Sequence, residues 1–379
     1  MPCQLAWGRA AMKLFRLCTE QIRLHEPLPW NVRNEAGQLL LSQGYLLADA
    51  AQLAALVERG VYVDQEAFEA TQRDTVRPEP AVLWADINQR VDTLLTQPLQ
   101  HLRFAEGVGA VSDDIHKGLL QDPDAGMFEV VNQDHRSYAV SHAVQTAFVA
   151  SLAAERFGLS ATERQTLSNA AITMNLGMLT MQNTLNTQAL PLTPQQRAVV
   201  NGHGAQSRAM LERAGVTDAD WLRTVERHHV RTDDKGLPTD RSDLNQLACL
   251  VHHADVYLAK ISARSYRPAL PAHVAARELF VKCGGAQNPY ATALIKEIGI
   301  YPPGSGVKLA NGDTAVVVRR GEQAHMPHVQ SLIAADGRPY PSALPRDTSL
   351  SPFKVVDAIP RGQVRLALRR KASLAQTAA

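Results

Sequence analysis

The residues of this sequence with the clearest potential for chemistry are four histidines and one aspartate. His142, His203, the adjacent His228 and His229, and Asp255 fall in four separate segments, each with helical spacing of apolar residues. Such side chains, spread over several helices of one bundle, can converge on a metal ion, because each helix supplies one or two inward ligands. Adjacent residues of a helix point about 100° apart. The two neighbouring histidines can therefore converge only near a helix end, which the Gly- and Pro-containing segment after them predicts. Spacing alone is a weak signal, and by itself it favours separate histidines that are held by local hydrogen bonds.

The elements that must position these residues are mostly helices. From about residue 126 to 300 the apolar residues follow the 3.6-residue repeat, and the segment 138–157 is apolar on all sides, as expected for the middle of a bundle. Before it, 28–65 predicts two short strands around a turn at 34–37 and then a helix; after it, "GVKLANGDTAVVVRR" predicts a hairpin that turns at Asn311–Gly312. We therefore expect a mostly α protein with a small α+β N-terminal domain and a short β-rich C-terminal extension. The predicted parts are an accessory domain at 24–70, a linker with connecting helices at 71–125, a helical domain at 126–305, the β-rich extension at 306–360 and a basic tail at 361–379.

Composition narrows the class of protein. The 379 residues are 45% apolar and carry a formal net charge of +2, so no strong field points to a nucleic-acid polymer or a membrane surface. Four cysteines lie far apart without a CxxC motif, which disfavours a disulfide framework and a cysteine zinc site and predicts a reducing, cytoplasmic location. No apolar run approaches the roughly 18 residues that a membrane span needs.

Taken in order, the histidine segments resemble the HD-GYP family of cyclic-di-GMP phosphodiesterases, in the HD superfamily, over roughly 130–320. "YAVSHAVQTAFVASLAAERFGLS" resembles the family's first helix, and "AAITMNLGMLTM" resembles its "HDIGKL" box. "PLTPQQRAVVNGHGAQS" resembles the segment with the next histidine, and "HHVRTDDKGLP" resembles the "HHExxDGxGYP" signature. "ADVYLAKISARSYRPAL" is similar to the distal aspartate segment, and "IGIYPPGSGVKL" to the usual exit. The segment 28–65 also resembles a small domain that precedes some members.

The resemblance implies an HD-type helical bundle and a chemistry in which two or three iron or manganese ions share a bridging aspartate and activate a water against a phosphodiester. It also implies a recognition loop that contacts diguanylate cyclase-type partners, and arginines suited to the phosphates of the dinucleotide. The residues carried over as metal ligands are His142, His203, His228, His229 and Asp255. Those carried over for ligand binding are Arg264, Arg267, Asp233, Gly236 and Pro238.

The sequence departs from the family at positions that matter for the metals. Met174 and Asn175 stand where the family has its His-Asp pair. A carboxylate bridges two cations through two equivalent charged oxygens, whereas asparagine offers one neutral carbonyl and methionine a soft thioether that suits such ions poorly. The family's tyrosine of the GYP triplet is Leu237, and the glutamate after the double histidine is Val230. We therefore expect no paired metal centre, and either no metal or one iron or manganese ion on the remaining ligands.

Three functions follow from these observations. The preferred one is a degenerate signalling protein, non-catalytic or very weak, that binds cyclic-di-GMP or a protein such as a diguanylate cyclase. The second is an active metal-dependent phosphodiesterase with a rearranged mononuclear site. The third is a scaffold in which the 28–65 domain does the binding. The sequence leaves a homodimer open.

Overall fold

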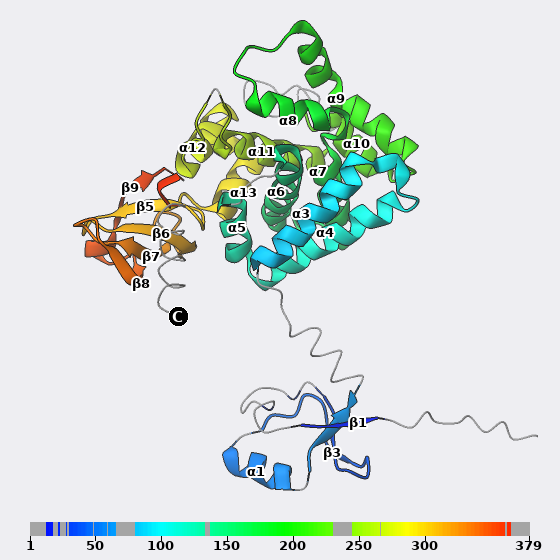
Figure 1. Ribbon diagram of the computed structural model, residues 1–379, viewed down its shortest axis with the longest axis vertical. Coiled ribbons are helices and arrows are strands. Elements are labelled where there is room, and N and C mark those ends of the chain that lie inside the picture. The colour runs from blue at the N-terminus through cyan, green and yellow to red at the C-terminus, as the bar shows by residue number, and fades with distance from the viewer. Residues whose placement is uncertain are drawn as a thin grey trace, which may run out of the picture. The chain divides into compact units, whose positions relative to one another are not determined.

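The computed structural model divides the chain into two units, Met1–Glu79 and Pro80–Ala379 (Figure 1). Each unit is described by itself. The structure describes residues 13–17, 22, 28, 30–47, 49–58, 60–65, 80–132, 137–229, 245–265, 267–360 and 362–364. The predicted linker before Pro80 and nearly all of the predicted basic tail lie outside these residues.

The described residues of the first unit form a four-stranded sheet and the helix α1. Strands β1 (Leu14–Arg16), β2 (Val32–Arg33), β3 (Leu39–Leu41) and β4 (Tyr62–Asp64) lie in the order β1-β4-β2-β3, and α1 is Ala50–Glu58. β2 and β3 pair antiparallel, and Gly37 adopts a φ of 79° in the turn between them, a conformation that glycine allows without steric cost. The sheet thus includes the hairpin that the sequence predicts, and also β1, which lies before the predicted boundary at residue 24.

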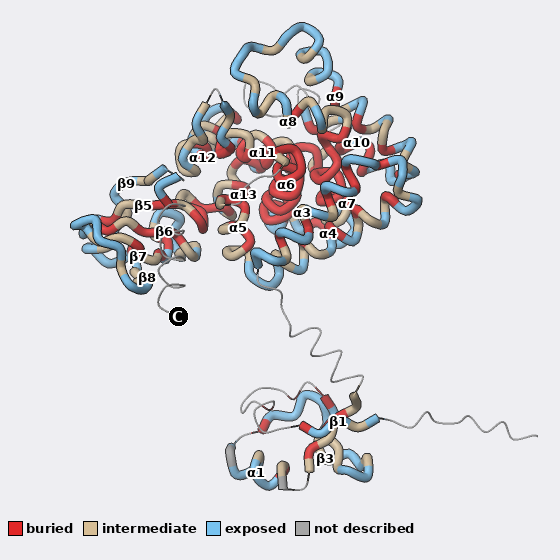
Figure 2. Tube along the Cα trace, in the orientation of Figure 1, coloured by how far each residue is buried: buried red, intermediate tan, exposed pale blue. Residues whose placement is uncertain are grey.

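The second unit is built around a buried helix. All residues of α6 (Tyr138–Ala154) are buried, and Figure 2 shows it enclosed by the other helices. The mostly α fold predicted from the apolar repeat is confirmed. No helix among the described residues is long and apolar enough to cross a membrane. The surrounding helices are α3 (Pro80–Thr96), α4 (Phe104–Gln121), α5 (Pro123–Asn132), α7 (Ala161–Thr173), α8 (Leu179–Thr187), α9 (Pro194–Arg213), α10 (Ala219–Arg227), α11 (Gln246–Ile261), α12 (Ala272–Lys282) and α13 (Pro289–Ile298), with short 3₁₀ turns η2 (Pro98–Gln100), η3 (Glu155–Phe157), η4 (Leu176–Met178) and η6 (Gly285–Gln287).

The predicted connecting helices belong to the same core. Trp84 of α3 packs edge-on against Phe148 of α6, with ring centroids 5.3 Å apart. Arg90 of α3 also forms an ion pair of 2.6 Å with Asp114 of α4. α3 and α4 therefore cover one side of the central helix.

Local sequence fixes where the helices that carry the site begin. Thr193 accepts a hydrogen bond from the Gln196 backbone N–H, the Gln196 side chain accepts one from the Thr193 N–H, and proline follows as the first residue of α9. Asp218 and Asn245 cap α10 and α11 in the same way, each accepting two backbone N–H groups. These caps fix the residues at which α9, α10 and α11 begin.

The C-terminal strands form an antiparallel sheet of order β8-β7-β6-β5-β9. The predicted hairpin is β5 with β6, and Gly312 has a φ of 88° in its turn. The sheet adjoins the helical body, where the Asn132 side chain donates to the carbonyl of Gly304 and Arg320 pairs with Asp124. The strands are β5 (Gly306–Leu309), β6 (Thr314–Arg319), β7 (His328–Ile333), β8 (Pro339–Asp347) and β9 (Val355–Ile359), with η7 (Ser351–Phe353) before the last.

Candidate functional site

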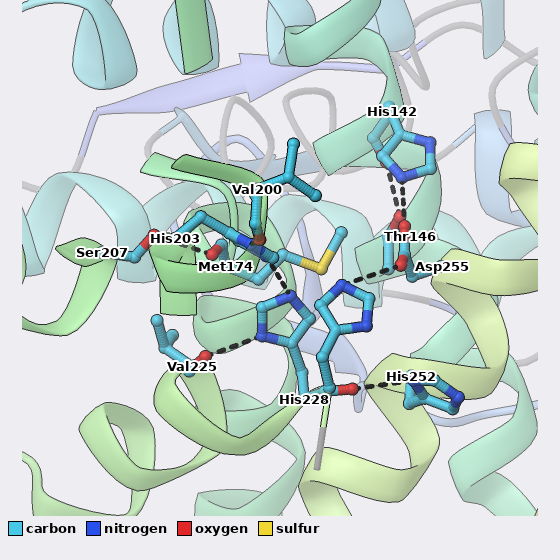
Figure 3. Close-up of polar contacts among 11 residues, drawn as sticks. His142, Thr146, Met174, Val200, His203, Ser207, Val225, His228, His252 and Asp255 are labelled. Carbon is cyan, nitrogen blue, oxygen red and sulfur yellow. Dashed lines mark hydrogen bonds and ion pairs between the residues drawn. The ribbon is translucent and has the colours of Figure 1, made fainter. Parts of the chain in front are cut away.

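Three of the predicted ligands form a cluster. His203 lies in α9, His228 follows the last residue of α10, and His229 comes directly after it. Their candidate ligand atoms all lie within 4.8 Å of one another. The helix end predicted for the double histidine is observed, because α10 stops at Arg227. The structure therefore brings together residues 25 positions apart into one group of imidazoles (Figure 3).

The hydrogen bonds of His203 and His228 show which ring nitrogens face each other. Nδ1 of His203 is 2.6 Å from the carbonyl of Val200, and Nδ1 of His228 is 2.7 Å from the carbonyl of Val225. A carbonyl only accepts, so each Nδ1 carries a hydrogen, and a ring in its neutral form turns a bare lone pair outward at Nε2. The two Nε2 atoms lie 3.0 Å apart. Two lone pairs at this distance repel unless a cation lies beside both.

A metal ion fits this position better than a proton. Burial, helped by the neighbouring His229 and His203, lowers the pKa of His228 well below its ordinary value, so the ring is neutral at physiological pH. Metal-bound histidines commonly donate their second ring N–H to a backbone carbonyl, as both rings do here. The donor set therefore fits a divalent cation.

Asp255 contacts two of the other predicted ligands, His142 and His229. His142 Nε2 donates to Asp255 Oδ1 over 2.6 Å, and His229 Nε2 lies 3.5 Å from Oδ2. Burial opposes ionisation of Asp255, but the hydrogen bond and charge of His142 and the nearby His229 outweigh it and lower the pKa below the ordinary 3.8. Asp255 is therefore an anion that links the central helix α6 to the three-histidine cluster.

Met174 and Asn175 lie in the link between α7 and α8. Met174 is 1% exposed and belongs to the hydrophobic core, and its carbonyl accepts from the hydroxyl of Ser207 on α9 over 2.8 Å. Asn175 is 5% exposed, and within the described part of the chain its Oδ1 has no hydrogen-bond partner. Asn175 thus places a neutral oxygen, with no partner among the described residues, in the link between α7 and α8.

Four of the residues described above line one cavity of about 520 Å³, a size suited to a small molecule. His142, Asn175, His229 and Asp255 lie in its wall, whereas His203 and His228 do not. The remaining lining residues are Tyr138, Met178, Gln182, Leu185, Asn186, Gln188, Ala189, Leu190, Pro191, Leu192, Val200, Ala259 and Arg264.

The predicted ligand-binding residues fall into three groups. Arg264 lines the cavity beside Tyr138, whose pKa is raised chiefly by burial and is held back by this guanidinium. Arg267 instead donates to the carbonyl of Ala259 over 2.7 Å, near the end of α11, and is not among the lining residues. The third group, Asp233, Gly236 and Pro238, lies outside the described residues.

The sequence reasoning missed two neighbouring histidines. His252 Nδ1 donates to the carbonyl of His228 over 2.8 Å and so holds the backbone between the two clustered histidines. His253 donates from Nδ1 to the carbonyl of Cys249 and accepts from the Asn288 amide at Nε2 over 3.0 Å, which ties α11 to α13. The position of His252 three residues before the aspartate was a signal that it shares a helix face with the site.

Comparisons with known proteins concern mainly the helical part of the chain. A family model described as an HD domain matches residues 127–281. This part of the chain is therefore similar to an HD domain. The cyclic di-GMP phosphodiesterase PA4108 of Pseudomonas aeruginosa is 24% identical over 226 residues, which cover 59% of this chain but only 55% of that protein. The HD domain and this kinship confirm the resemblance predicted from the motifs.

A solved structure that aligns with the chain is that of Bd1817, an HDG"Y"P protein from Bdellovibrio bacteriovorus. It is 14% identical, the alignment covers 75% of this chain and 99% of that chain, and the TM-score is 0.47.

Proposed function

We propose that this protein is a degenerate HD-GYP-type component of cyclic-di-GMP signalling that holds one divalent cation and acts by binding, not by efficient hydrolysis. The observation that carries this proposal is the buried Oδ1 of Asn175, which has no partner among the described residues; the resemblance to the family assigns this position to the bridging carboxylate. The dinucleotide is carried over from the related phosphodiesterase.

The charge of the site supports one cation and disfavours two. Two neighbouring cations repel, and a two-metal centre depends on a shared anion to hold them together. Asp255 is the only carboxylate among the described residues that line the cavity, and it is engaged by His142 and His229. One cation on His203, His228 and His229 needs no such bridge, since sites with three histidine ligands occur in proteins. Iron or manganese is the expected metal.

Binding of the dinucleotide depends on groups that survive in the cavity. Arg264 offers a guanidinium at its wall, and this group matches phosphate oxygens in charge and geometry. Loss of the bridging carboxylate removes the chemistry but not this contact. The second candidate, an active phosphodiesterase with a mononuclear centre, is favoured by the contact of Asp255 with His229, which would let the two groups of ligands share one ion. The protein partner, a homodimer and the cytoplasmic location remain predictions from the sequence.

Isothermal titration of the full chain with cyclic-di-GMP, with and without Mn²⁺, tests the proposal together with an assay for hydrolysis. We expect binding without measurable turnover. Arg264→Gln should weaken binding at least tenfold, which corresponds to about 1.4 kcal/mol, the lower end for a charge-assisted hydrogen bond. The matched control is Arg319→Gln on the exposed end of β6. Steady turnover, or no binding at all, would refute the proposal.

A further inference from the structure

We infer that Gly204 is a positioning residue for the proposed cation site, because the missing side chain at this position lets α9 approach α10 closely enough for His203 to meet His228. This inference rests on the proposed function, since it concerns the three-histidine cluster. It names a residue that touches no metal and yet sets the separation of two of the ligands.

The first observation is that only space accounts for a glycine at position 204. Gly204 lies in the interior of α9, directly after His203, and does not adopt a positive φ. Glycine is less stable than alanine in a helix interior, so the helical backbone gives no reason for it. A Cβ atom here would lie 2.7 Å from the carbonyl oxygen of Glu226 and 3.3 Å from that of Val225. Real Cβ atoms essentially never approach within 3.0 Å of another heavy atom, so this contact requires glycine.

The two carbonyls belong to the stretch of chain that orients His228. Val225 and Glu226 lie in the last turn of α10, and the carbonyl of Val225 accepts from Nδ1 of His228 over 2.7 Å. In α9, Nδ1 of His203 donates to the carbonyl of Val200 over 2.6 Å (Figure 3). Each ring is thus tied to the backbone of its own helix. A change in the separation of α9 and α10 therefore passes to the two Nε2 atoms, which lie 3.0 Å apart.

The size of the displacement decides whether a methyl group at position 204 matters. Ordinary van der Waals contact begins at about 3.4 Å, so an alanine would require α9 to move away from the Glu226 carbonyl by about 0.7 Å. The obstructing atom is part of the backbone and cannot swing aside as the end of a flexible side chain can. Binding groups must be held within about 0.5 Å of their working geometry. The expected shift exceeds this tolerance.

An ion pair joins the same two helices on their exposed side. Arg208, four residues after Gly204 in α9, places Nη1 2.6 Å from Oε2 of Glu226. An exposed ion pair of this kind contributes little on its own. The close approach of the helices therefore depends mainly on the glycine, with a smaller contribution from Arg208.

The experiment measures the Mn²⁺ affinity of full-length variants by isothermal titration and their stability by urea denaturation. Gly204→Ala should weaken Mn²⁺ binding by about tenfold or more, the size of effect seen when a group that orients a metal ligand is disturbed. The matched control is Gly202→Ala, the same substitution in the same helix. Among the described residues, a Cβ atom at position 202 would meet nothing within 4 Å outside its own helix, so the affinity should not change.

A second control separates positioning from a general loss of stability. The buried Ser207 of α9 contacts a different element, because its hydroxyl donates to the carbonyl of Met174 over 2.8 Å and accepts from the N–H of Gly177 over 2.9 Å. Ser207→Ala should lower the urea midpoint but keep the Mn²⁺ affinity of the wild type. If Gly204 had a structural role alone, Gly204→Ala would behave in the same way.

The outcomes separate this inference from the proposed function. An unchanged affinity in Gly204→Ala, or an equal loss in either control, overturns the role of Gly204 but leaves the cation site. If Gly204→Ala does not fold, Arg208→Gln takes its place, since it loosens the same contact from the exposed side. It should weaken Mn²⁺ binding about threefold, and an unchanged affinity would overturn the inference. Failure of the wild-type chain to bind Mn²⁺ refutes the proposed cation site itself.

Discussion

Restoring the family's pair by Met174→His together with Asn175→Asp should create a second metal site. The new carboxylate would be placed at a position that is 5% exposed, in the same cavity as the anionic Asp255. Without metal, burial and the like charge should raise the pKa of this carboxyl by about two to three units, at 1.36 kcal/mol per unit. A carboxyl whose pKa is raised on folding destabilises the protein above its unfolded pKa, so the metal-free double variant should lose about 3–4 kcal/mol at pH 7.

Metal should reverse this loss. A cation at 100 times its dissociation constant contributes about 2.7 kcal/mol, so Mn²⁺ should recover most of the stability, seen as a melting temperature that falls by about 5–10 °C without metal and returns with it. Anaerobic reconstitution followed by elemental analysis should give two metal ions per chain. Met174→His alone, which adds a ligand but no anion, is the control and should stay at one. The reasoning is refuted if the double variant binds no second ion, or if its metal-free form is as stable as the wild type.

Three further predictions concern residues around the proposed metal site. His252→Ala removes the hydrogen bond to the His228 carbonyl and should weaken Mn²⁺ binding about tenfold in isothermal titration; unchanged affinity would contradict a positioning role. Asn288→Ala removes the cap of α13 and the partner of buried His253, and should lower the free energy of unfolding by about 2–4 kcal/mol in urea denaturation while metal binding persists. Because the folded pKa of Asp255 lies below 3.8, its stabilising contribution should be present above about pH 4 and be lost as the pH falls further; Asp255→Asn should flatten this part of the curve of unfolding free energy against pH.

Much of the fold could be predicted because the spacing of apolar residues in the sequence reflects which side of each element is buried. The central helix α6 is apolar on every side in the sequence and buried on every side in the structure. The Asn311–Gly312 pair marks the β5–β6 turn because glycine allows the positive φ found there. The predicted end of the helix before the double histidine holds because no other geometry lets His228 and His229 converge with His203.

The rest of the site depends on partners that are remote in sequence. Gln182 and Asn186 look like ordinary polar residues of an amphipathic helix, and only packing shows that their oxygens are buried and unpaired. In the same way, Arg264 and Arg267 lie three residues apart, and the sequence predicts phosphate binding for both. The structure turns one to the cavity and the other to the carbonyls of α11. Spacing can propose which residues meet, but the paired or unpaired state of each atom is set by the tertiary fold.

The most direct test of a single-cation site is the metal content of the wild-type chain, purified without oxygen and reconstituted with excess Fe²⁺ or Mn²⁺. One equivalent, lost on replacement of His203 by alanine and retained on replacement of the exposed His325, is the predicted result. Two equivalents bound tightly beside Asn175 would contradict the account.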